Sequence, residues 1–159
     1  MPTPTYRLID SVTLGSSAAS VTFSSISQDF GDLILVSNHA TTGGADIRFR
    51  INGDTGSNYS WVQMYGTGSS AASNSTTSDH FFDYGTPTTL GATISVQFMD
   101  YSATDKHKSV LARRDWSAAT TLAAAGRWAN TSAITTILAY TAAGSFAAGS
   151  TFYLYGIEA

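Results

Sequence analysis

The sequence predicts an all-β protein: a two-sheet antiparallel β-sandwich, jelly-roll-like, with about ten strands and no major helix. Three observations indicate this fold. Apolar and polar residues alternate with a period of two in segments along the whole chain. Gly, Pro and Asn-Gly turn signals separate these segments. Residues that usually cover helix surfaces are scarce, since the 159 residues include one Glu and two Lys.

Individual strands follow from the alternation. The segment 33–36 is apolar at every position, which predicts a central strand buried on both faces. In 47–51, Ile47, Phe49 and Ile51 alternate with polar residues and are expected to face the core. The predicted strands, in chain order, are 6–14, 20–25, 33–36, 47–51, 59–65, 92–101, 109–113, 122–128, 134–140 and 151–157.

The remaining segments are assigned by composition. The Ser/Thr-rich segment 67–78 is expected to be a long, mobile loop. An Ala-rich stretch at 118–125 could form a helix, but it lacks a capping box and Gly126 follows it, so a helix is not favoured. Residues 1–5 are expected to form an N-terminal arm, either frayed or lying along a neighbouring subunit. Residues 6–159 are expected to form a single sandwich domain.

Composition excludes several classes of partner. Charged residues make up 12% of the chain, with 8 Lys+Arg against 11 Asp+Glu, so no basic surface for nucleic acid is expected. The absence of Cys excludes disulfides, thiolate zinc sites and a cysteine nucleophile. The longest aliphatic run, 33–36, is far shorter than the roughly 20 residues of a spanning helix, so no membrane partner is expected. With an N-terminal Met and no signal peptide, the chain is expected to be a complete product made in the cytoplasm.

No motif predicts catalysis or a cofactor. His39, His80 and His107 show no metal-ligand spacing and are expected to be separate surface or half-buried residues. The segment 52–58 alternates oxygen-bearing side chains but lacks the terminal Glu of a calcium loop, so a turn is favoured. GxSxG and GxxxxGK[ST] motifs are absent. We therefore expect no enzyme, no cofactor and no metal, although a converging carboxylate pair of a glycosidase could come from Asp79, Asp83, Asp100, Asp105 and Asp115.

Two sets of residues are interface candidates. Tyr59, Trp61 and Tyr65 share one parity of a strand, which favours core or subunit interface over the alternative of a sugar-stacking platform. Arg48 and Arg50 are expected to project together from the face opposite the core. They either pair locally with an Asp on a solvated face or meet acidic groups of a neighbouring subunit.

Four segments carry a resemblance to a known group of proteins. They are TLGSSAASVTFSSI at 13–26, RINGDTGSNYS at 50–60, KHKSVL at 106–111 and GSTFYLYGI at 149–157. In this order they resemble small jelly-roll-type structural proteins of tailed bacteriophages, especially those of aquatic and cyanobacterial hosts. Members include head decoration (cement) proteins and modules of tail or fibre proteins, so the resemblance implies a virion component without catalytic residues.

The function expected from this resemblance is structural. The first hypothesis is a capsid decoration protein that stabilises the head as a homo-oligomer, with a trimer favoured, through contacts with the major capsid protein or other virion proteins. It would be made in the host cytoplasm and assembled on the particle exterior. The alternative is a tail or fibre module that binds a host receptor or glycan. Low charge and abundant small residues, including 22 Ser, 22 Thr and 22 Ala, favour close, flat contacts in an assembly.

Overall fold

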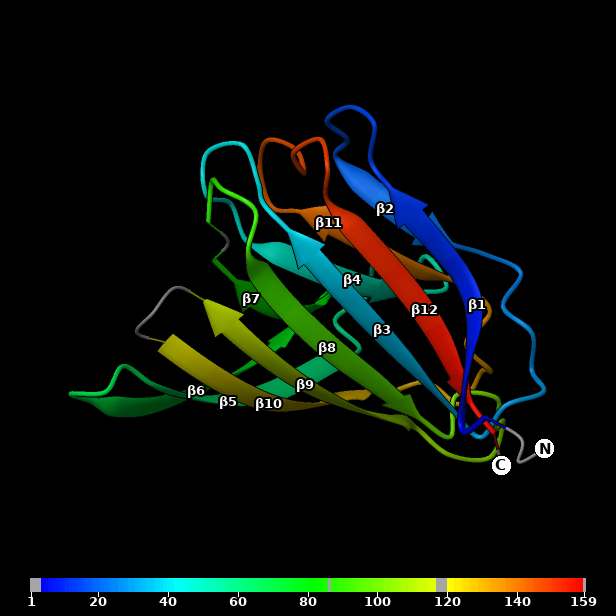
Figure 1. The fold of residues 1–159 in the computed structure, drawn as a ribbon. Helices are drawn as coiled ribbons and strands as arrows, with labels where there is room; N and C mark the ends of the chain where they lie inside the picture. Colours follow the sequence, from blue (N-terminus) through cyan, green and yellow to red (C-terminus); the bar gives the residue numbers. More distant parts are fainter. Residues whose placement is uncertain (1–3, 86, 117–119, 159) are drawn as a thin grey trace.

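The chain folds into two β-sheets packed face to face. The computed structural model describes residues 4–85, 87–116 and 120–158, in which twelve strands form two antiparallel sheets and no helix occurs (Figure 1). The larger sheet contains, in spatial order, β1 (Tyr6–Thr13), β12 (Thr151–Ile157), β3 (Asp32–His39), β8 (Ala92–Met99), β9 (Lys108–Trp116), β10 (Thr120–Trp128), β5 (Tyr59–Gly66) and β6 (Ala71–Ser78). The smaller sheet contains β2 (Ser20–Phe23), β11 (Ile137–Thr141), β4 (Ile47–Ile51) and β7 (Phe81–Tyr84). The predicted all-β sandwich is confirmed.

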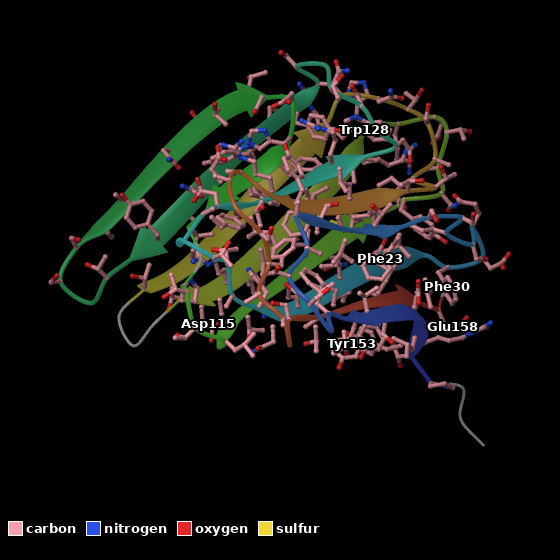
Figure 2. All side chains as sticks on the ribbon, turned by 90° about the horizontal axis from the view of Figure 1, so that it is seen from above. Phe23, Phe30, Asp115, Trp128, Tyr153 and Glu158 are labelled. Atoms are coloured by element: carbon pink, nitrogen blue, oxygen red, sulfur yellow. The ribbon has the colours of Figure 1, made fainter. Side chains whose placement is uncertain are left out.

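The core lies between the sheets and takes one face of each layer (Figure 2). β4 and β8 alternate strictly between buried and half-buried positions, as their sequences predict. Large rings fill much of the space, and Phe23, Tyr59 and Trp128 are almost completely buried. Each such side chain stabilises the fold by about 1.5–3 kcal/mol through apolar burial.

The predicted loop at 67–78 is largely wrong. Residues 71–78 form β6, which pairs antiparallel with β5 from Ala71 opposite Gly66 to Ser78 opposite Tyr59. Only 67–70 turn, closed by a hydrogen bond from Thr67 N to Ser70 O. The strand escaped prediction because nearly every residue in it is exposed, so no apolar alternation marks it.

β7 was also missed and raises the total from about ten strands to twelve. Phe81 and Phe82 are adjacent, yet both are fully buried, whereas successive residues of a regular strand in a two-layer sandwich face opposite sides of the sheet. Phe82 has φ 63°, and the pairing with β4 shifts register nearby, between Ile47 and Phe49. This local irregularity turns both rings toward the core.

Three further expectations have clear outcomes. The segment 33–36 does lie in a central strand, β3, but Ile34 and Val36 are only half-buried, because no second layer covers that face. The expectation of burial on both faces is therefore wrong. The strand predicted at 122–128 is confirmed within β10, which also includes residues 120 and 121 of the Ala-rich stretch, whereas 118 and 119 lie outside the described residues. Residues 1–3 of the arm also lie outside them, and Thr5 O accepts a hydrogen bond from Glu158 N.

Candidate functional site

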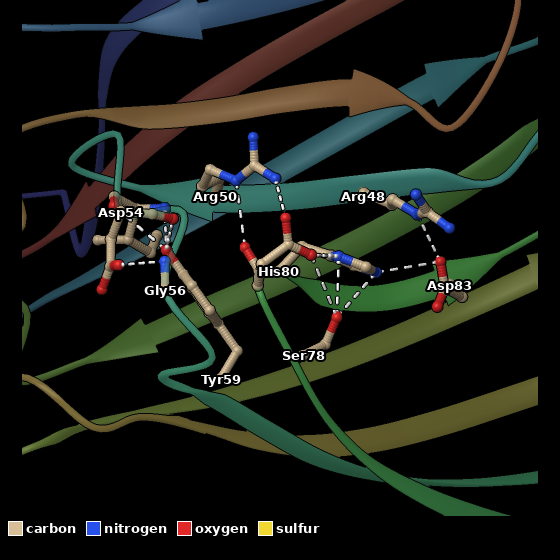
Figure 3. Close-up of polar contacts among 10 residues, drawn as sticks. Arg48, Arg50, Asp54, Gly56, Tyr59, Ser78, His80 and Asp83 are labelled. Carbon is tan, nitrogen blue, oxygen red and sulfur yellow. Dashed lines mark hydrogen bonds and ion pairs between the residues drawn. The ribbon is translucent and has the colours of Figure 1, made fainter.

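A group of charged residues lies on the solvent side of the smaller sheet. This β4–β7 polar cluster consists of Arg48 and Arg50 from β4, and Asp79, His80 and Asp83 at and before β7 (Figure 3). Arg48 Nε lies 2.5 Å from Asp83 Oδ1, and Arg50 Nη2 lies 2.5 Å from Asp79 Oδ2. Arg50 Nε also donates to Asp79 O at 3.1 Å. Each arginine thus holds β7 against β4 through a carboxylate of its own chain.

The electrostatics of this cluster follow from its pairing. Burial would lower the pKa of Arg48, but the hydrogen bond and charge of Asp83 outweigh it, so that pKa is raised. The pKa of Asp79 is lowered, mainly by its hydrogen bond with His80 and then by the charge of Arg50. Arg50 also lies over the Tyr140 ring, 4.8 Å from its centroid, a cation–π contact. The charges of this face are therefore largely balanced within the chain.

His80 is held between two carboxylates. Its Nδ1 is 2.6 Å from Asp79 Oδ1 and its Nε2 is 3.2 Å from Asp83 Oδ1. Ser78 Oγ lies 3.0 Å from the same Nδ1 (Figure 3). A serine nucleophile requires a histidine that contacts serine with one ring nitrogen and its orienting carboxylate with the other. Here a carboxylate contacts each ring nitrogen, Asp79 at Nδ1 and Asp83 at Nε2, and Ser78 lies farther from Nδ1 than Asp79 does. Neither ring nitrogen is therefore left to serine alone, as the nitrogen facing the nucleophile is in a triad.

The expected orientation of the arginine pair is confirmed. Ile47, Phe49 and Ile51 are fully buried, whereas Arg48 and Arg50 are on the opposite face with side chains 29% and 18% exposed. The local pairing with aspartates is also confirmed. Both guanidinium groups bond carboxylates of the same chain. Contact of this pair with a neighbouring subunit stays a prediction.

The aromatic candidates lie mainly inside the molecule. Tyr59 and Trp61 are in the core, and Tyr65 packs against it half-buried. This is the core placement favoured from the sequence, and it removes Tyr59 and Trp61 from any stacking surface of the single chain. The Tyr59 hydroxyl receives the N–H of Ile51 at 3.0 Å and donates to Asp54 O at 3.0 Å. This ring therefore fixes the connection between β4 and β5.

The oxygen-rich segment 52–58 is a turn, as the Asn-Gly signal predicts. Asp54 Oδ1 accepts the N–H of Gly56 at 2.9 Å, and Oδ2 accepts from Asn58 Nδ2 at 2.9 Å and from Trp128 Nε1 at 2.7 Å. Burial would raise the pKa of Asp54, but these hydrogen bonds outweigh it and lower that pKa. The carboxylate of this turn is thus engaged by donors of the protein itself.

The expectation that all three histidines are at the surface or half-buried is wrong for His39 and His80, which are 0% and 6% exposed. His39 is fully buried and stacks on Phe152 at 6.0 Å between ring centroids, whereas His107 is exposed. Burial, aided by the charge of Arg114, lowers the pKa of His39 to about 4. Among the residues that the structure describes, no three or more His, Asp or Glu are arranged to hold a metal ion. The same residues include no helix long and apolar enough to cross a membrane.

The larger sheet has an unusual solvent side, which we call the outer face. Strand register aligns one residue from each of its eight strands in a row without any charge. This outer row consists of Leu8, Tyr155, Ile34, Gln97, Leu111, Ala125, Val62 and Ser75. The adjacent row carries one charge, on Arg113, in the series Ser11, Tyr153, Val36, Ser95, Arg113, Ala123, Met64 and Ser73.

Large apolar side chains on this face are open to solvent. Met64 is 63% exposed, Val62 51% and Leu111 43%, and the three surround a shallow depression floored by Ala123–Ala125. A solvated antiparallel sheet face is normally polar, and extended apolar patches mark sites of contact with other molecules. Sequence reasoning missed the outer face because the rows join strands far apart in the chain, although the exposed parity of 59–65 already carried Val62 and Met64.

Comparison with known proteins yields only remote likenesses. No protein-family model matches the chain, and no curated protein matches it. Alginate lyase Aly36B is similar at 13% identity, over 92% of this chain and 77% of that chain, with TM-score 0.38. Galectin LEC-6 of Caenorhabditis elegans is similar at 6% identity, over 98% and 96%, with TM-score 0.37. A toad ovary galectin in complex with thio-digalactose is similar at 10% identity, over 75% and 98%, with TM-score 0.30. These likenesses are too remote to carry an argument about activity.

Proposed function

We propose that the chain is a non-enzymatic structural protein of a tailed-bacteriophage virion, a head decoration protein that attaches through the outer face. The carrying observation is the outer row, which crosses all eight strands without a charge and exposes Leu8, Leu111 and Val62. The tailed-phage context comes from the sequence resemblance of the four segments described above. The partners of this role are further copies of the chain and the major capsid protein.

The outer face supplies the binding free energy in this account. Covering exposed aliphatic side chains contributes about 25 cal/mol per Å² of apolar surface removed from water. Only Arg113 is charged in the two central rows, so few ions are desolvated on contact. The broad eight-stranded sheet can bridge several capsid subunits, and internal DNA pressure must then break more contacts to open the head. Attachment of this kind depends weakly on salt.

The receptor- or glycan-binding module is the alternative. In that hypothesis the stacking surface consists of Tyr59, Trp61 and Tyr65, but the rings of Tyr59 and Trp61 lie in the core. The outer face offers Tyr153 and Tyr155 instead, half-buried and stacked at 6.4 Å between centroids. This pair is flanked by aliphatic residues such as Val36 and Ile34, which favours a protein surface over a sugar.

The experiment compares binding of the chain to heads assembled without it. Changing Val62→Ser and Met64→Ser together is expected to lower the bound fraction roughly tenfold or more, because two exposed aliphatic contacts are lost. The matched control is Leu90→Ser, since Leu90 is 50% exposed but lies in the loop after β7. Heads with the chain should also withstand higher temperature than heads without it. Equal binding of the double variant, or equal heat resistance of bare heads, would contradict the proposal.

A further inference from the structure

The two sheets have four edges, and three of them are protected against pairing with another chain. β1 carries Arg7 and Asp10 and a register shift between Leu8 and Asp10. β2 and β7 are four residues long each, and β7 pairs irregularly with β4. Charges, bulges and short strands are the usual protections of sheet edges. The fourth edge, β6, has none of them.

β6 is a long and regular edge. It pairs with β5 over all eight residues without a register shift, and Ala71–Thr77 are exposed on both faces. From residue 59 through residue 78 the chain contains no charged residue and no proline. Figure 1 shows β6 at the end of the larger sheet, beyond β7 of the smaller one. Its Ala, Ser and Asn residues have low strand propensity, so this strand gains little from its own side chains.

We infer that β6 is a self-association edge, at which β6 of a second copy of this chain adds antiparallel and joins two larger sheets into one. The inference rests on the proposed oligomeric role and names the contact that would create it. Main-chain N–H and C=O groups on the outer side of β6 supply the bonds, as in other strand-addition contacts. The pairing buries no charge, because the whole segment is uncharged.

Symmetry restricts the register of this contact. Two copies in one antiparallel sheet are related by a two-fold axis normal to the sheet, which keeps each face on its own side. In an antiparallel pair, residues directly opposite one another project to the same face of the sheet. The two-fold axis therefore requires that, at the centre of the contact, one β6 residue lies opposite the same residue of the second copy. Asn74 or Ser75 near the middle of the strand satisfies this condition. The outer faces of both copies then form one continuous surface for attachment.

A second copy suits this edge better than a foreign peptide does. Strand-addition sites select a peptide by pockets for its alternate side chains. The hollows that β6 helps to line are shared with residues of β5 and β10, so they lie over strands inside the sheet and not along its free edge. A symmetric pair of β6 strands needs no side-chain recognition, because the two-fold axis repeats every main-chain hydrogen bond of one copy in the other. This contact yields dimers, in contrast to the trimer expected from the sequence.

The test is the solution mass of the full chain, measured by light scattering and sedimentation over a range of concentrations. Wild type is expected at twice the 16.7 kDa chain mass. Ser73→Lys with Ser75→Lys places like charges opposite each other in either central register and should raise the dimer dissociation constant roughly tenfold or more. Ser73→Asp with Ser75→Asp should do the same, and mixing the two variants should restore a dimer. Ser11→Lys with Thr13→Lys on the outer face of β1 is the matched control and should stay dimeric.

The outcomes separate this inference from the proposed function. A monomeric or trimeric wild type, or a dimer that persists in both charged β6 variants, would overturn edge pairing. Lack of recovery on mixing the Lys and Asp variants would also overturn it. Failure of edge pairing leaves binding of single chains to heads intact. Failure of head binding by wild type leaves the solution dimer intact and counts against the outer face alone.

Discussion

The indole N–H of Trp128 donates to Asp54 Oδ2 at 2.7 Å and ties the end of β10 to the turn between β4 and β5. Trp128 is nearly fully buried, so its N–H depends on this acceptor. Asp54→Ala is expected to lower the free energy of unfolding by about 2–3 kcal/mol, because a buried donor loses its partner and the turn loses its closing bonds. Urea denaturation measures the change. The exposed Asp105→Ala is the control, and an equal effect of the two would contradict this role of Asp54.

Acid should destabilise the protein through His39. Burial lowers the pKa of His39 to about 4 in the folded state, below its ordinary 6.5. The unfolded chain therefore takes up the proton first, and stability that is complete above pH 6.5 declines as pH falls toward 4. The expected loss is about 3 kcal/mol. His39→Gln should flatten this dependence in chemical denaturation at several pH values, whereas exposed His107→Gln should leave it as in wild type. An unchanged slope in His39→Gln would disprove the assignment.

Arg50 should not be replaceable by lysine. Its guanidinium bonds both the carbonyl and the carboxylate of Asp79 and lies over Tyr140. A lysine keeps the charge but cannot hold this planar arrangement, so Arg50→Lys should cost about 1 kcal/mol. Exposed Arg127→Lys is the matched control, with an expected change near zero. Thermal unfolding of both variants checks the difference. Equal melting temperatures would show that the planar guanidinium contacts of Arg50 are dispensable.

Gly156 marks a close approach between a strand and a ring. A Cβ there would lie 2.2 Å from Phe30 Cγ, so Phe30 must move if any side chain is added. Gly156→Ala is expected to cost about 1–3 kcal/mol by overpacking. Gly15→Ala is the control, because nothing lies within 4 Å of a Cβ at that position. If calorimetry finds Gly156→Ala as stable as Gly15→Ala, Phe30 does not pack on this strand.

Strands with one buried face were predictable from the sequence, because the core imposes period-two alternation on them. β4 is the clearest case, since Phe49 is fully buried and Arg48 faces outward as expected. β6 was not predictable, because main-chain pairing with β5 sets it and its side chains are exposed. The paired Phe81 and Phe82 hid β7 for a different reason, the positive φ of Phe82.

The candidate surfaces were only partly predictable. Alternation placed Arg48 and Arg50 on one face, but several aspartates could have paired with them. Their partners come from tertiary structure, as Arg50 reaches Asp79 across 29 residues. The outer row combines strands from both ends of the chain, such as Leu8 beside Tyr155. Register between distant strands fixes such a row, and no local pattern encodes it.

Copy number in purified virions tests the central claim most directly. Quantitative mass spectrometry against the major capsid protein would give the number of copies of this chain per particle. A decoration protein attached through the outer face should be present in hundreds of copies and should be lost from particles that carry the Val62→Ser and Met64→Ser changes. A few to a few dozen copies would favour the tail or fibre module, and absence of the chain from virions would contradict a structural role altogether.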